Sequence, residues 1–432
     1  MTAIPRYLLP DTAEIAADGR LLIGGVDVVA LVETVGTPVF IYDEAHLRAR
    51  CREAATAFPS GAAYASKAFL CRAMAQLAHQ EGMLIDVSTA GELHVALDAG
   101  VPANRLVLHG NNKSDAELTS ALTLGVHRIV VDSFAEIDRL ALLAPAINAR
   151  VGRPDQPVLV RVTPGVHAHT HTYVMTGQED SKFGFSIASG AAAEAMERLA
   201  RLRGVEVVGV HAHIGSQIFD LSAYDKAAEI LTRFVAGRGL RELCIGGGLG
   251  VAYVAGETAP SITEWAATVR AAFTAAGLPS DVAITAEPGR SVVASAAITL
   301  YRVGTIKELP DIRTYVAVDG GMSDNPRPVL YGSGYETFLP RVTDAERPLA
   351  ATLVGKHCES GDVIVTDACL PADLAVDDIV ATPVTGAYGH SMSSTYNKVP
   401  RAAVVFVRDG DAHVVVRRES LADLTHLDAD LP

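Results

Sequence analysis

The chain contains little cysteine, with only Cys51, Cys71, Cys244, Cys358 and Cys369 among its 432 residues. Their number is odd, none belongs to a CxxC pair, and a chain of this length does not need crosslinks to stabilise its core. The sequence therefore predicts no disulfide framework and favours a reducing cytoplasm. Most of these cysteines are expected to be small buried apolar side chains.

Positive charge and long apolar runs are also scarce. There are 36 Lys and Arg residues against 50 Asp and Glu residues, which gives a formal net charge of −14. A general nucleic-acid or anionic-membrane surface requires a basic face, so we expect neither partner. No stretch approaches the ~20 apolar residues that span a bilayer, and the N-terminal segment lacks the features of a secretory signal. We expect a cytoplasmic protein.

The middle of the chain, from about residue 60 to residue 290, alternates short β-like runs with amphipathic segments. Eight β-like runs lie at 61–66, 83–88, 105–110, 127–132, 157–164, 205–215, 242–248 and 282–289. Helical patterns lie between them at 116–125, 134–147, 189–202 and 262–277. Eight strand and helix units predict a closed (β/α)8 barrel, a TIM-like α/β fold, with an open doubly wound sheet as the alternative.

Both ends of the chain have a different pattern. After residue 295 the sequence becomes rich in alternating Val and Thr, for example at 296–308 and 402–418, which is typical of antiparallel strands. The segments 21–28 and 37–43 are strand-like too. We therefore predict a barrel domain over residues 45–295 and a mostly antiparallel β domain formed by residues 1–44 and 296–432.

A lysine and a glycine run stand at the carboxyl ends of predicted strands, where a barrel enzyme places its reacting residues. Lys67 follows the first strand, where partial desolvation would free its amine to form a Schiff base; a snorkelling surface lysine is the alternative. The run 246–248 follows the seventh strand, where backbone N–H groups can approach a phosphate. A plain tight turn would have the same sequence. The dinucleotide pattern G-x-G-x-x-G is excluded because Val251 occupies its last position.

A carboxylate and an arginine, Glu287 and Arg290, follow the eighth predicted strand. The carboxylate could keep a pyridine nitrogen protonated, and the arginine could bind a substrate carboxylate with two hydrogen bonds. The alternative is that the two side chains only pair with each other.

Histidines provide a rival hypothesis. His211 and His213 end the sixth predicted strand and would point to the same side. Together with the alternating histidines of 167–171 they favour a metal-dependent hydrolase on the same barrel. That hypothesis explains Lys67 and the glycine run poorly, because a hydrolase requires no phosphate cradle. His213 could instead stack on an aromatic cofactor, with Ser216 adding a phosphate contact.

Two further clusters lie in the predicted β domain. KHCESGD places Cys358 beside Glu359, and TGAYGHSM supplies Tyr388. A cysteine that can donate a proton, next to a carboxylate that can bind an amine, suits an enzyme acting on amino acids.

Taken together, the motifs resemble the fold-type III pyridoxal-phosphate enzymes, and the chain is similar to the diaminopimelate decarboxylase family along nearly its whole length. The residues that carry the resemblance are YASKA, DVSTAGEL, LHGNNKSDAEL, RVTPGVHAHTHTYVMTGQEDSKFGF, HAHIGSQI, GGGLG, EPGR, NPRPVLYG, GKHCESGD and TGAYGHSM. The resemblance implies an alanine-racemase-like barrel plus a β domain, pyridoxal phosphate as cofactor, and a homodimer with active sites at the subunit interface. The implied reaction is decarboxylation of meso-2,6-diaminopimelate at its D centre to L-lysine and CO2, the last step of lysine biosynthesis.

Residue roles also follow from the resemblance. Lys67 would hold the cofactor, His213 would stack on its ring, Glu287 would face the pyridine nitrogen, and Cys358 of the partner subunit would donate the proton. The residues that would hold the phosphate are Ser216, Gly246, Gly247, Gly248, the backbone of Glu287, Pro288, Gly289 and Arg290, and Tyr388. The residues that would bind the substrate are Arg290, Arg327, Tyr331, Glu359 and Tyr388. No metal is implied.

Two departures from the family pattern are Thr163, where asparagine is common, and His167, where aspartate is frequent. Neither falls on a residue with an implied chemical role.

Two other functions remain open beside the metal hydrolase. A decarboxylase of the same fold that acts on ornithine, arginine or carboxynorspermidine would share the cofactor residues, but we would not expect it to carry GQEDSKFGF together with CESGD. A non-catalytic, regulatory homologue that binds the cofactor would need no proton donor. The intact KHCESGD cluster weighs against it.

Overall fold

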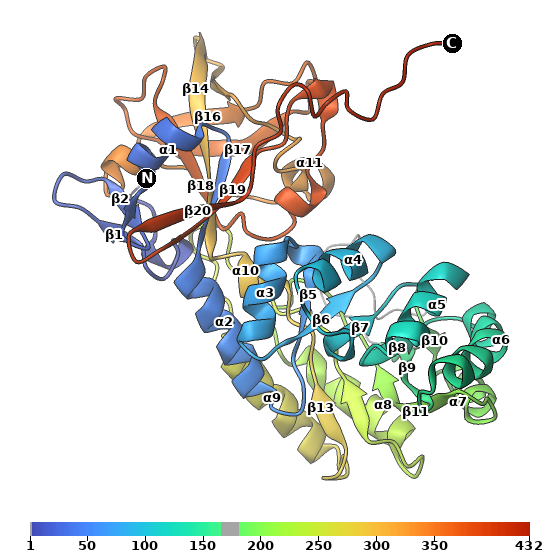
Figure 1. The fold of residues 1–432 in the computed structure, drawn as a ribbon. Coiled ribbons are helices and arrows are strands. Elements are labelled where there is room, and N and C mark those ends of the chain that lie inside the picture. The colour runs from blue at the N-terminus through green and yellow to red at the C-terminus, as the bar shows by residue number, and fades with distance from the viewer. Residues whose placement is uncertain (1, 166–180) are drawn as a thin grey trace. The chain divides into compact units, whose positions relative to one another are not determined.

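The computed structural model describes residues 2–165 and 181–432, which form two compact units (Figure 1). The barrel unit consists of Arg50–Gly250 and Ala259–Ser291. The β unit consists of Met1–Ala49, Val251–Thr258 and Val292–Pro432.

Eight parallel strands form the centre of the barrel unit. In order around the sheet they are β5 (Ala63–Ala65), β6 (Leu84–Val87), β7 (Leu106–Leu108), β8 (Arg128–Val131), β9 (Gln156–Thr163), β11 (Val205–His211), β12 (Glu242–Cys244) and β13 (Ala283–Thr285). A parallel bridge between Ala62 and Ala286 joins the last strand to the first. The predicted (β/α)8 barrel is confirmed, and the open doubly wound sheet is wrong. A short extra strand that the sequence did not predict, β10 (Phe185–Ser186), pairs with β9.

Helices surround these strands, as Figure 1 shows for the barrel unit. They are α3 (Arg72–Gln80), α4 (Ala90–Asp98), α5 (Asp115–Leu124), α6 (Phe134–Val151), α7 (Ala191–Ala200), α8 (Ala223–Val235) and α9 (Ile262–Ala275), and α2 (Glu44–Ala57) precedes β5. Local sequence fixes where several begin, because the side chains of Thr89, Ser114, Ser133 and Ser261 accept hydrogen bonds from backbone N–H groups in the first turn. Small apolar side chains from six different strands fill the interior, among them Ala63, Val107 and Cys244. The barrel is therefore a packed core rather than a pore.

The β unit is built around a mixed sheet in which one N-terminal strand is central. Its order is β17 (Val363–Leu370), β16 (Leu349–Val354), β15 (Arg313–Val318), β14 (Ala297–Leu309), β4 (Val39–Asp43), β19 (Ala403–Arg408) and β20 (Asp411–Val416). The strand β4 is antiparallel to β14 and parallel to β19, and all five of its residues are buried. The β domain formed by both chain ends is thereby confirmed.

Smaller elements complete the β unit. The strand β18 (Ile379–Pro383) also pairs with β14, and β1 (Glu14–Ile15), β2 (Leu21–Ile23) and β3 (Val26–Asp27) form a separate small sheet. The helices here are α1 (Val28–Val35) and the short α11 (Arg327–Tyr331), and α10 (Arg290–Val293) leads into the unit.

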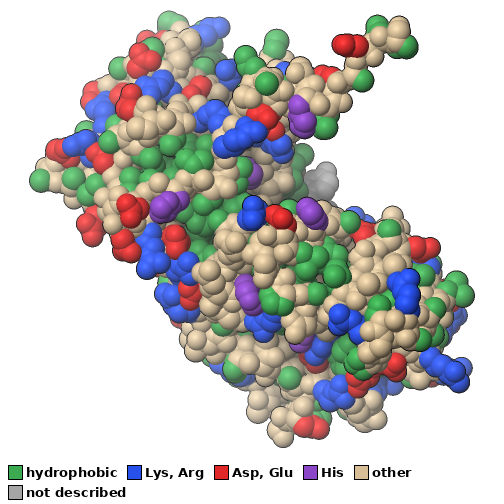
Figure 2. Space-filling view, in the orientation of Figure 1, with side chains coloured by type: hydrophobic (Ala, Val, Ile, Leu, Met, Phe, Trp, Pro, Cys, Tyr) green, Lys and Arg blue, Asp and Glu red, His purple; other side chains and the backbone are tan. Residues whose placement is uncertain are grey.

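Charged side chains of both signs are interspersed on the face of the molecule shown in Figure 2. Such mixing is typical of a surface in contact with water. Among the described residues, no helix combines the length and the apolar character required to cross a membrane.

Candidate active site

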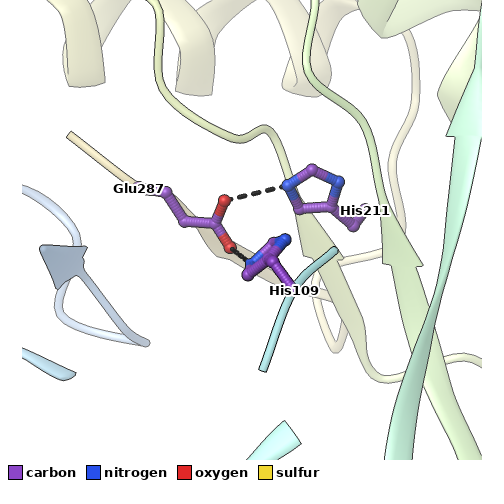
Figure 3. Close-up of side chains that lie close together, drawn as sticks. All are labelled: His109, His211 and Glu287. Carbon is purple, nitrogen blue, oxygen red and sulfur yellow. Dashed lines mark hydrogen bonds and ion pairs between the residues drawn. The ribbon is translucent and has the colours of Figure 1, made fainter. Parts of the chain in front are cut away.

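A buried carboxylate between two histidines lies at the carboxyl ends of the barrel strands (Figure 3). Glu287 follows β13, His211 is the last residue of β11, and His109 directly follows β7. His109 Nε2 is 2.9 Å from one oxygen of Glu287, and His211 Nε2 is 2.9 Å from the other. Because an ionised carboxylate only accepts hydrogen bonds, both imidazoles donate to it. The carboxylate therefore bonds to two histidines, and the sequence did not predict this arrangement.

The histidines determine the charge of this cluster. Burial alone would favour the neutral acid, but the charges and hydrogen bonds of His109 and His211 hold the pKa of Glu287 well below its usual range. Burial opposes the His109 cation, yet Asp86 and Glu287 outweigh it and raise the pKa of His109. Burial lowers the pKa of His211 and raises that of Asp86. The cluster thus favours an ionised Glu287 and the cationic form of His109, whereas burial favours the neutral form of His211.

Lys67 lies next to this cluster. It belongs to a 3-10 turn, Ser66–Ala68, that directly follows β5, and its side chain is exposed whereas those of Ser66 and Ala68 are buried. Burial, and after it the nearby charge of Lys67, lower the pKa of His213 well below its usual value. The neutral His213 accepts a hydrogen bond at Nδ1 from Gly247 N–H, at 3.2 Å.

The glycine run 246–248 is a tightly packed turn in which larger residues do not fit. A Cβ atom on Gly247 would lie 2.4 Å from the carbonyl oxygen of Glu287, and one on Gly248 would lie 2.3 Å from that of Gly215. Gly246 and Gly248 also have positive φ angles of 65° and 113°. This turn therefore touches the backbone on both sides of the candidate site, at Glu287 and next to Ser216.

The segment after Glu287 contacts the strand that bears Lys67. Ala65 N–H donates to the carbonyl of Pro288 at 3.1 Å, and a Cβ atom on Gly289 would lie 2.9 Å from the Cβ of Ala65. The barrel residues that the sequence singled out thus adjoin one another at one end of the barrel. Arg290 begins α10.

In the β unit, Cys358 and Glu359 are exposed on the loop between β16 and β17. The loop is anchored by the buried His357, whose Nε2 is 2.8 Å from Ser323 Oγ. Cys358 N–H donates to Asn397 Oδ1 at 3.0 Å, and the hydroxyl of Tyr396 donates to Glu359 at 3.4 Å. The cysteine and the carboxylate are therefore held side by side at the surface of this unit.

Arg327, also in the β unit, is enclosed by two tyrosines. Its guanidinium lies 4.2 Å from the ring centroid of Tyr253 and 5.5 Å from that of Tyr335, and it donates to the Tyr335 hydroxyl. Tyr331 is four residues further along α11 and so lies on the same helix face. The two enclosing tyrosines were not predicted, because neither belongs to a motif that sequence reasoning singled out.

Tyr388 belongs to a strained loop of the β unit. Its φ angle is +59°, a left-handed conformation that is uncommon for a bulky residue and often marks a functional position. The hydroxyl of Tyr42 fixes this loop by donating to the carbonyl of Gly386 at 2.8 Å.

The structure does not support the pair of metal ligands expected from the sequence, but it offers a different set. His211 and His213 do not act as a pair, because β11 ends at His211 and the two side chains bond to Glu287 and to Gly247, respectively. His109, His211 and Glu287 nevertheless place their ligand atoms within 4.8 Å of one another, so this set could also hold a metal ion. His167, His169 and His171 lie outside the described residues.

Sequence reasoning missed His109 and Asp86 as site residues. Each is a polar residue at the end of an apolar strand run, RLVLH and MLID, and that signal could have found them.

Comparisons with known proteins identify several similar chains. Residues 44–294 match the family described as "Pyridoxal-dependent decarboxylase, pyridoxal binding domain". The chain is 48% identical to a diaminopimelate decarboxylase of Mycobacterium tuberculosis, with 95% of each chain covered. It is 44% identical to that of Bacillus subtilis, also with 95% of each covered. A crystal structure of diaminopimelate decarboxylase from M. jannaschii in complex with L-lysine superposes with a TM-score of 0.89 at 30% identity, covering 98% of both chains.

Proposed function

Since the chain belongs to the diaminopimelate decarboxylase family of pyridoxal-dependent decarboxylases, we propose that it decarboxylates meso-2,6-diaminopimelate at its D centre. The products are L-lysine and CO2, and this reaction is the last step of lysine biosynthesis. The observation that carries this proposal is the placement of Lys67, the glycine turn 246–248 and the ionised Glu287 at one end of one barrel.

The described residues fit pyridoxal phosphate. The glycine turn leaves no space for side chains, so its backbone can approach a phosphate closely. Glu287 is an anion in a buried position, which suits a partner that carries a proton on a ring nitrogen. We infer that Lys67 holds the cofactor through its amine, His213 lies on its ring, and Glu287 faces its ring nitrogen. Ser216, Gly246 to Gly248, the backbone of 287–290 and Tyr388 then hold the phosphate.

Different residues have different roles in the proposed reaction. When bound, the cofactor supplies an electron-accepting ring that can take up the electron pair left by the departing CO2. Glu287 keeps the ring nitrogen protonated, since an adjacent anion favours the cationic form of that nitrogen. Cys358 of the partner subunit delivers a proton to the substrate Cα atom. Protonation of the Cα atom gives an L-amino acid as product.

Substrate selection is assigned to the β unit and to Arg290. Arg290 and Arg327 bind carboxylates, Glu359 binds the amino group at the distant centre, and Tyr331 and Tyr388 line the site. A substrate that lacks the distant carboxylate would leave a charged group unpaired, which is the physical basis for rejecting lysine or ornithine.

We further propose that the enzyme is a cytoplasmic homodimer with shared active sites, in which the two units serve as the barrel and β domains. The cytoplasm is supported by the small, odd number of cysteines, none of which belongs to a CxxC pair. The dimer is supported by the exposed position of Cys358 and Glu359, which leaves both side chains accessible to a second chain.

One assay tests the reaction. Purified protein is incubated with pyridoxal phosphate and meso-diaminopimelate, and CO2 and L-lysine are measured, with L-ornithine and L-arginine as control substrates. We expect the protein to turn over diaminopimelate but neither L-ornithine nor L-arginine. Preferential turnover of ornithine or arginine would instead assign another decarboxylase activity, and no turnover of any substrate would favour a non-catalytic homologue.

Removal of the cofactor and removal of metals distinguish the proposed decarboxylase from the remaining hypothesis, a metal-dependent hydrolase. Stripping pyridoxal phosphate should abolish activity and adding it back should restore it, whereas a chelator should have no effect. The reverse pattern would identify a metal-dependent enzyme, with His109, His211 and Glu287 as its first candidate ligands.

A further inference from the structure

We propose that His109 and His211 are positioning residues that hold Glu287 from both sides, so that its carboxylate faces the ring nitrogen of the cofactor. This inference rests on the proposed function, and it assigns a task to two residues that have no role in that proposal. Asp86 lies near the same nitrogen of His109 that bonds to Glu287.

The hydrogen bonds are arranged so that each carboxylate oxygen has one imidazole donor. His109 Nε2 and His211 Nε2 each lie 2.9 Å from a different oxygen (Figure 3). A carboxylate oxygen has two acceptor positions, so each oxygen keeps one for a further N–H group. The two histidines fix the orientation of Glu287 without using up its capacity to bind a ring N–H.

The histidines are themselves fixed. His109, His211 and Glu287 lie at the ends of three different strands, β7, β11 and β13, so each backbone is anchored in the barrel separately. The two imidazole rings pack edge to face, with centroids 4.9 Å apart, which restricts rotation of both side chains. Asp86, at 3.6 Å from His109 Nε2, adds an acidic neighbour to His109.

Burial explains why Glu287 needs two donors. Only 7% of the residue is exposed, and an isolated carboxylate at such a position would become protonated. Other charged side chains that act on the cluster are Lys67 and Glu92, which act on Asp86, and Arg161 of β9, which acts on His109. A neutral Glu287 would lose its attraction for a protonated ring nitrogen. The donors therefore keep the carboxylate in the form that the cofactor requires.

The test compares two ligands and measures binding rather than turnover. The first ligand is pyridoxal phosphate, and the second is its analogue in which a CH group replaces the ring nitrogen. Binding of each to the cofactor-free protein is titrated by absorbance. His109→Phe and His211→Phe remove the donor, whereas His109→Gln and His211→Gln keep an N–H group at about the same reach.

We expect each phenylalanine variant to weaken binding of pyridoxal phosphate by about ten- to a hundred-fold, the usual effect of losing a hydrogen bond to a charged group. Binding of the nitrogen-free analogue should remain within about two-fold, because that ligand has no N–H group for Glu287 to bind. The glutamine variants should recover most of the difference. His94→Gln, on the exposed face of α4, is the matched control and should affect neither ligand.

Glu287→Gln distinguishes a failure of the role proposed for Glu287 from a failure of the positioning role proposed for the histidines. If this variant weakens both ligands equally, Glu287 does not face the ring nitrogen, and that part of the proposed function fails. If it discriminates between the ligands but the histidine variants do not, the positioning role of the histidines is overturned. Equal binding of pyridoxal phosphate by the glutamine and phenylalanine variants would overturn it as well.

Two accompanying measurements exclude simpler causes. Circular dichroism and gel filtration report folding. If a phenylalanine variant does not fold, the glutamine variants are compared with the wild-type protein. The glutamine variants are then expected to bind pyridoxal phosphate and the nitrogen-free analogue with the same difference in affinity as the wild-type protein. Metal analysis of the wild-type protein should find no stoichiometric ion, and an ion that is lost in His109→Phe would overturn the proposal in favour of a metal site.

Discussion

Lys67 is the one exposed side chain in a turn whose other two side chains are buried, and it lies where its charge acts on His213, Asp86 and Glu92. Lys67→Ala should abolish both turnover and the visible absorbance of the bound cofactor, because the amine that holds it is gone. Absorbance spectra and CO2 release measure both effects.

Lys67→Arg is the matched control for charge. It keeps a cation next to His213 but provides no amine of suitable reactivity, so it should be as inactive as Lys67→Ala. An active and yellow variant of either kind would refute the role of Lys67.

Another residue whose state depends on its surroundings is Asp324, which is 1% exposed in the β unit. Burial, assisted by Asp319 and Asp362, raises its pKa from 3.8 to about 7. Between these values the unfolded chain releases a proton that the folded protein retains, so stability falls as the pH rises and the penalty is complete above pH 7. Three pKa units correspond to at most about 4 kcal/mol.

Asp324→Asn should remove this penalty while keeping an acceptor for Gly321 N–H, which lies 3.0 Å from the carboxylate. We expect the variant to gain stability at pH 8 relative to wild type and to change little at pH 4. Urea unfolding at both pH values measures the difference. The interpretation fails if both proteins show the same dependence of unfolding free energy on pH.

At the scale of elements, the turns that follow the strands carry the residues proposed to bind the cofactor. Gly247→Ala would drive a Cβ atom to within 2.4 Å of the carbonyl oxygen of Glu287, and backbone cannot move aside as a flexible side chain can. We expect the affinity for pyridoxal phosphate to fall at least about ten-fold, because the turn and Glu287 are displaced together. Equilibrium titration of the cofactor-free protein measures this loss.

Gly304→Ala is the control for the glycine variant. A Cβ atom on Gly304, in β14, would come no closer than 3.9 Å to Ala317 O, so cofactor affinity should be unchanged. Equal affinity of Gly247→Ala and wild type would mean that the turn does not hold the phosphate.

Periodicity of the sequence located all eight barrel strands, but it placed the ends of three of them four residues too late. The sixth, seventh and eighth were predicted to reach residues 215, 248 and 289, whereas β11 ends at His211, β12 at Cys244 and β13 at Thr285. The chain stays mostly buried after it leaves the sheet at these ends. Hydrophobic pattern reports burial, not hydrogen bonding between strands. The residues so misassigned include Glu287 and the glycine turn 246–248 of the candidate site.

Partners in the site were harder to predict than the site residues themselves. Lys67 and Glu287 could be proposed because each follows a recognisable strand. The contacts of Glu287 were not, since His109 is 178 positions away and His211 is 76 positions away in the sequence. Likewise, Tyr253 was assigned to no role, although it contacts Arg327, 74 positions further along the chain. A single sequence gives positions along strands but not which side chains meet.

On the scale of the whole molecule, the proposed chemistry is divided between the two units. The barrel unit carries Lys67 and Glu287, and the β unit carries Cys358, Glu359 and Arg327. A homodimer could combine the barrel of one chain with the β unit of the other, giving two equivalent sites related by symmetry. Loss of Cys358 would then affect the site of the partner subunit, not that of its own.

Subunit mixing tests this division directly. Lys67→Ala and Cys358→Ala are each expected to form dimers with little activity, the cysteine variant still binding cofactor. After the two are mixed in equal amounts and allowed to exchange subunits, half of the dimers should be mixed, and one of the two sites in each should contain both intact residues. Activity should therefore recover to about a quarter of wild type. CO2 release measures recovery, and native mass spectrometry of differently tagged chains verifies exchange.

The control for mixing is a pair of variants from the same unit. Lys67→Ala mixed with Glu287→Gln should recover nothing, because the mixed dimer then has one damaged barrel in each site. If verified exchange restores no activity to the Lys67→Ala and Cys358→Ala mixture, the two residues serve a site within one chain. Recovery in both mixtures would contradict the placement of Lys67 and Glu287 in the same site. Only the proposed arrangement gives recovery in the first mixture and none in the second, since it alone takes the lysine and the cysteine from different chains.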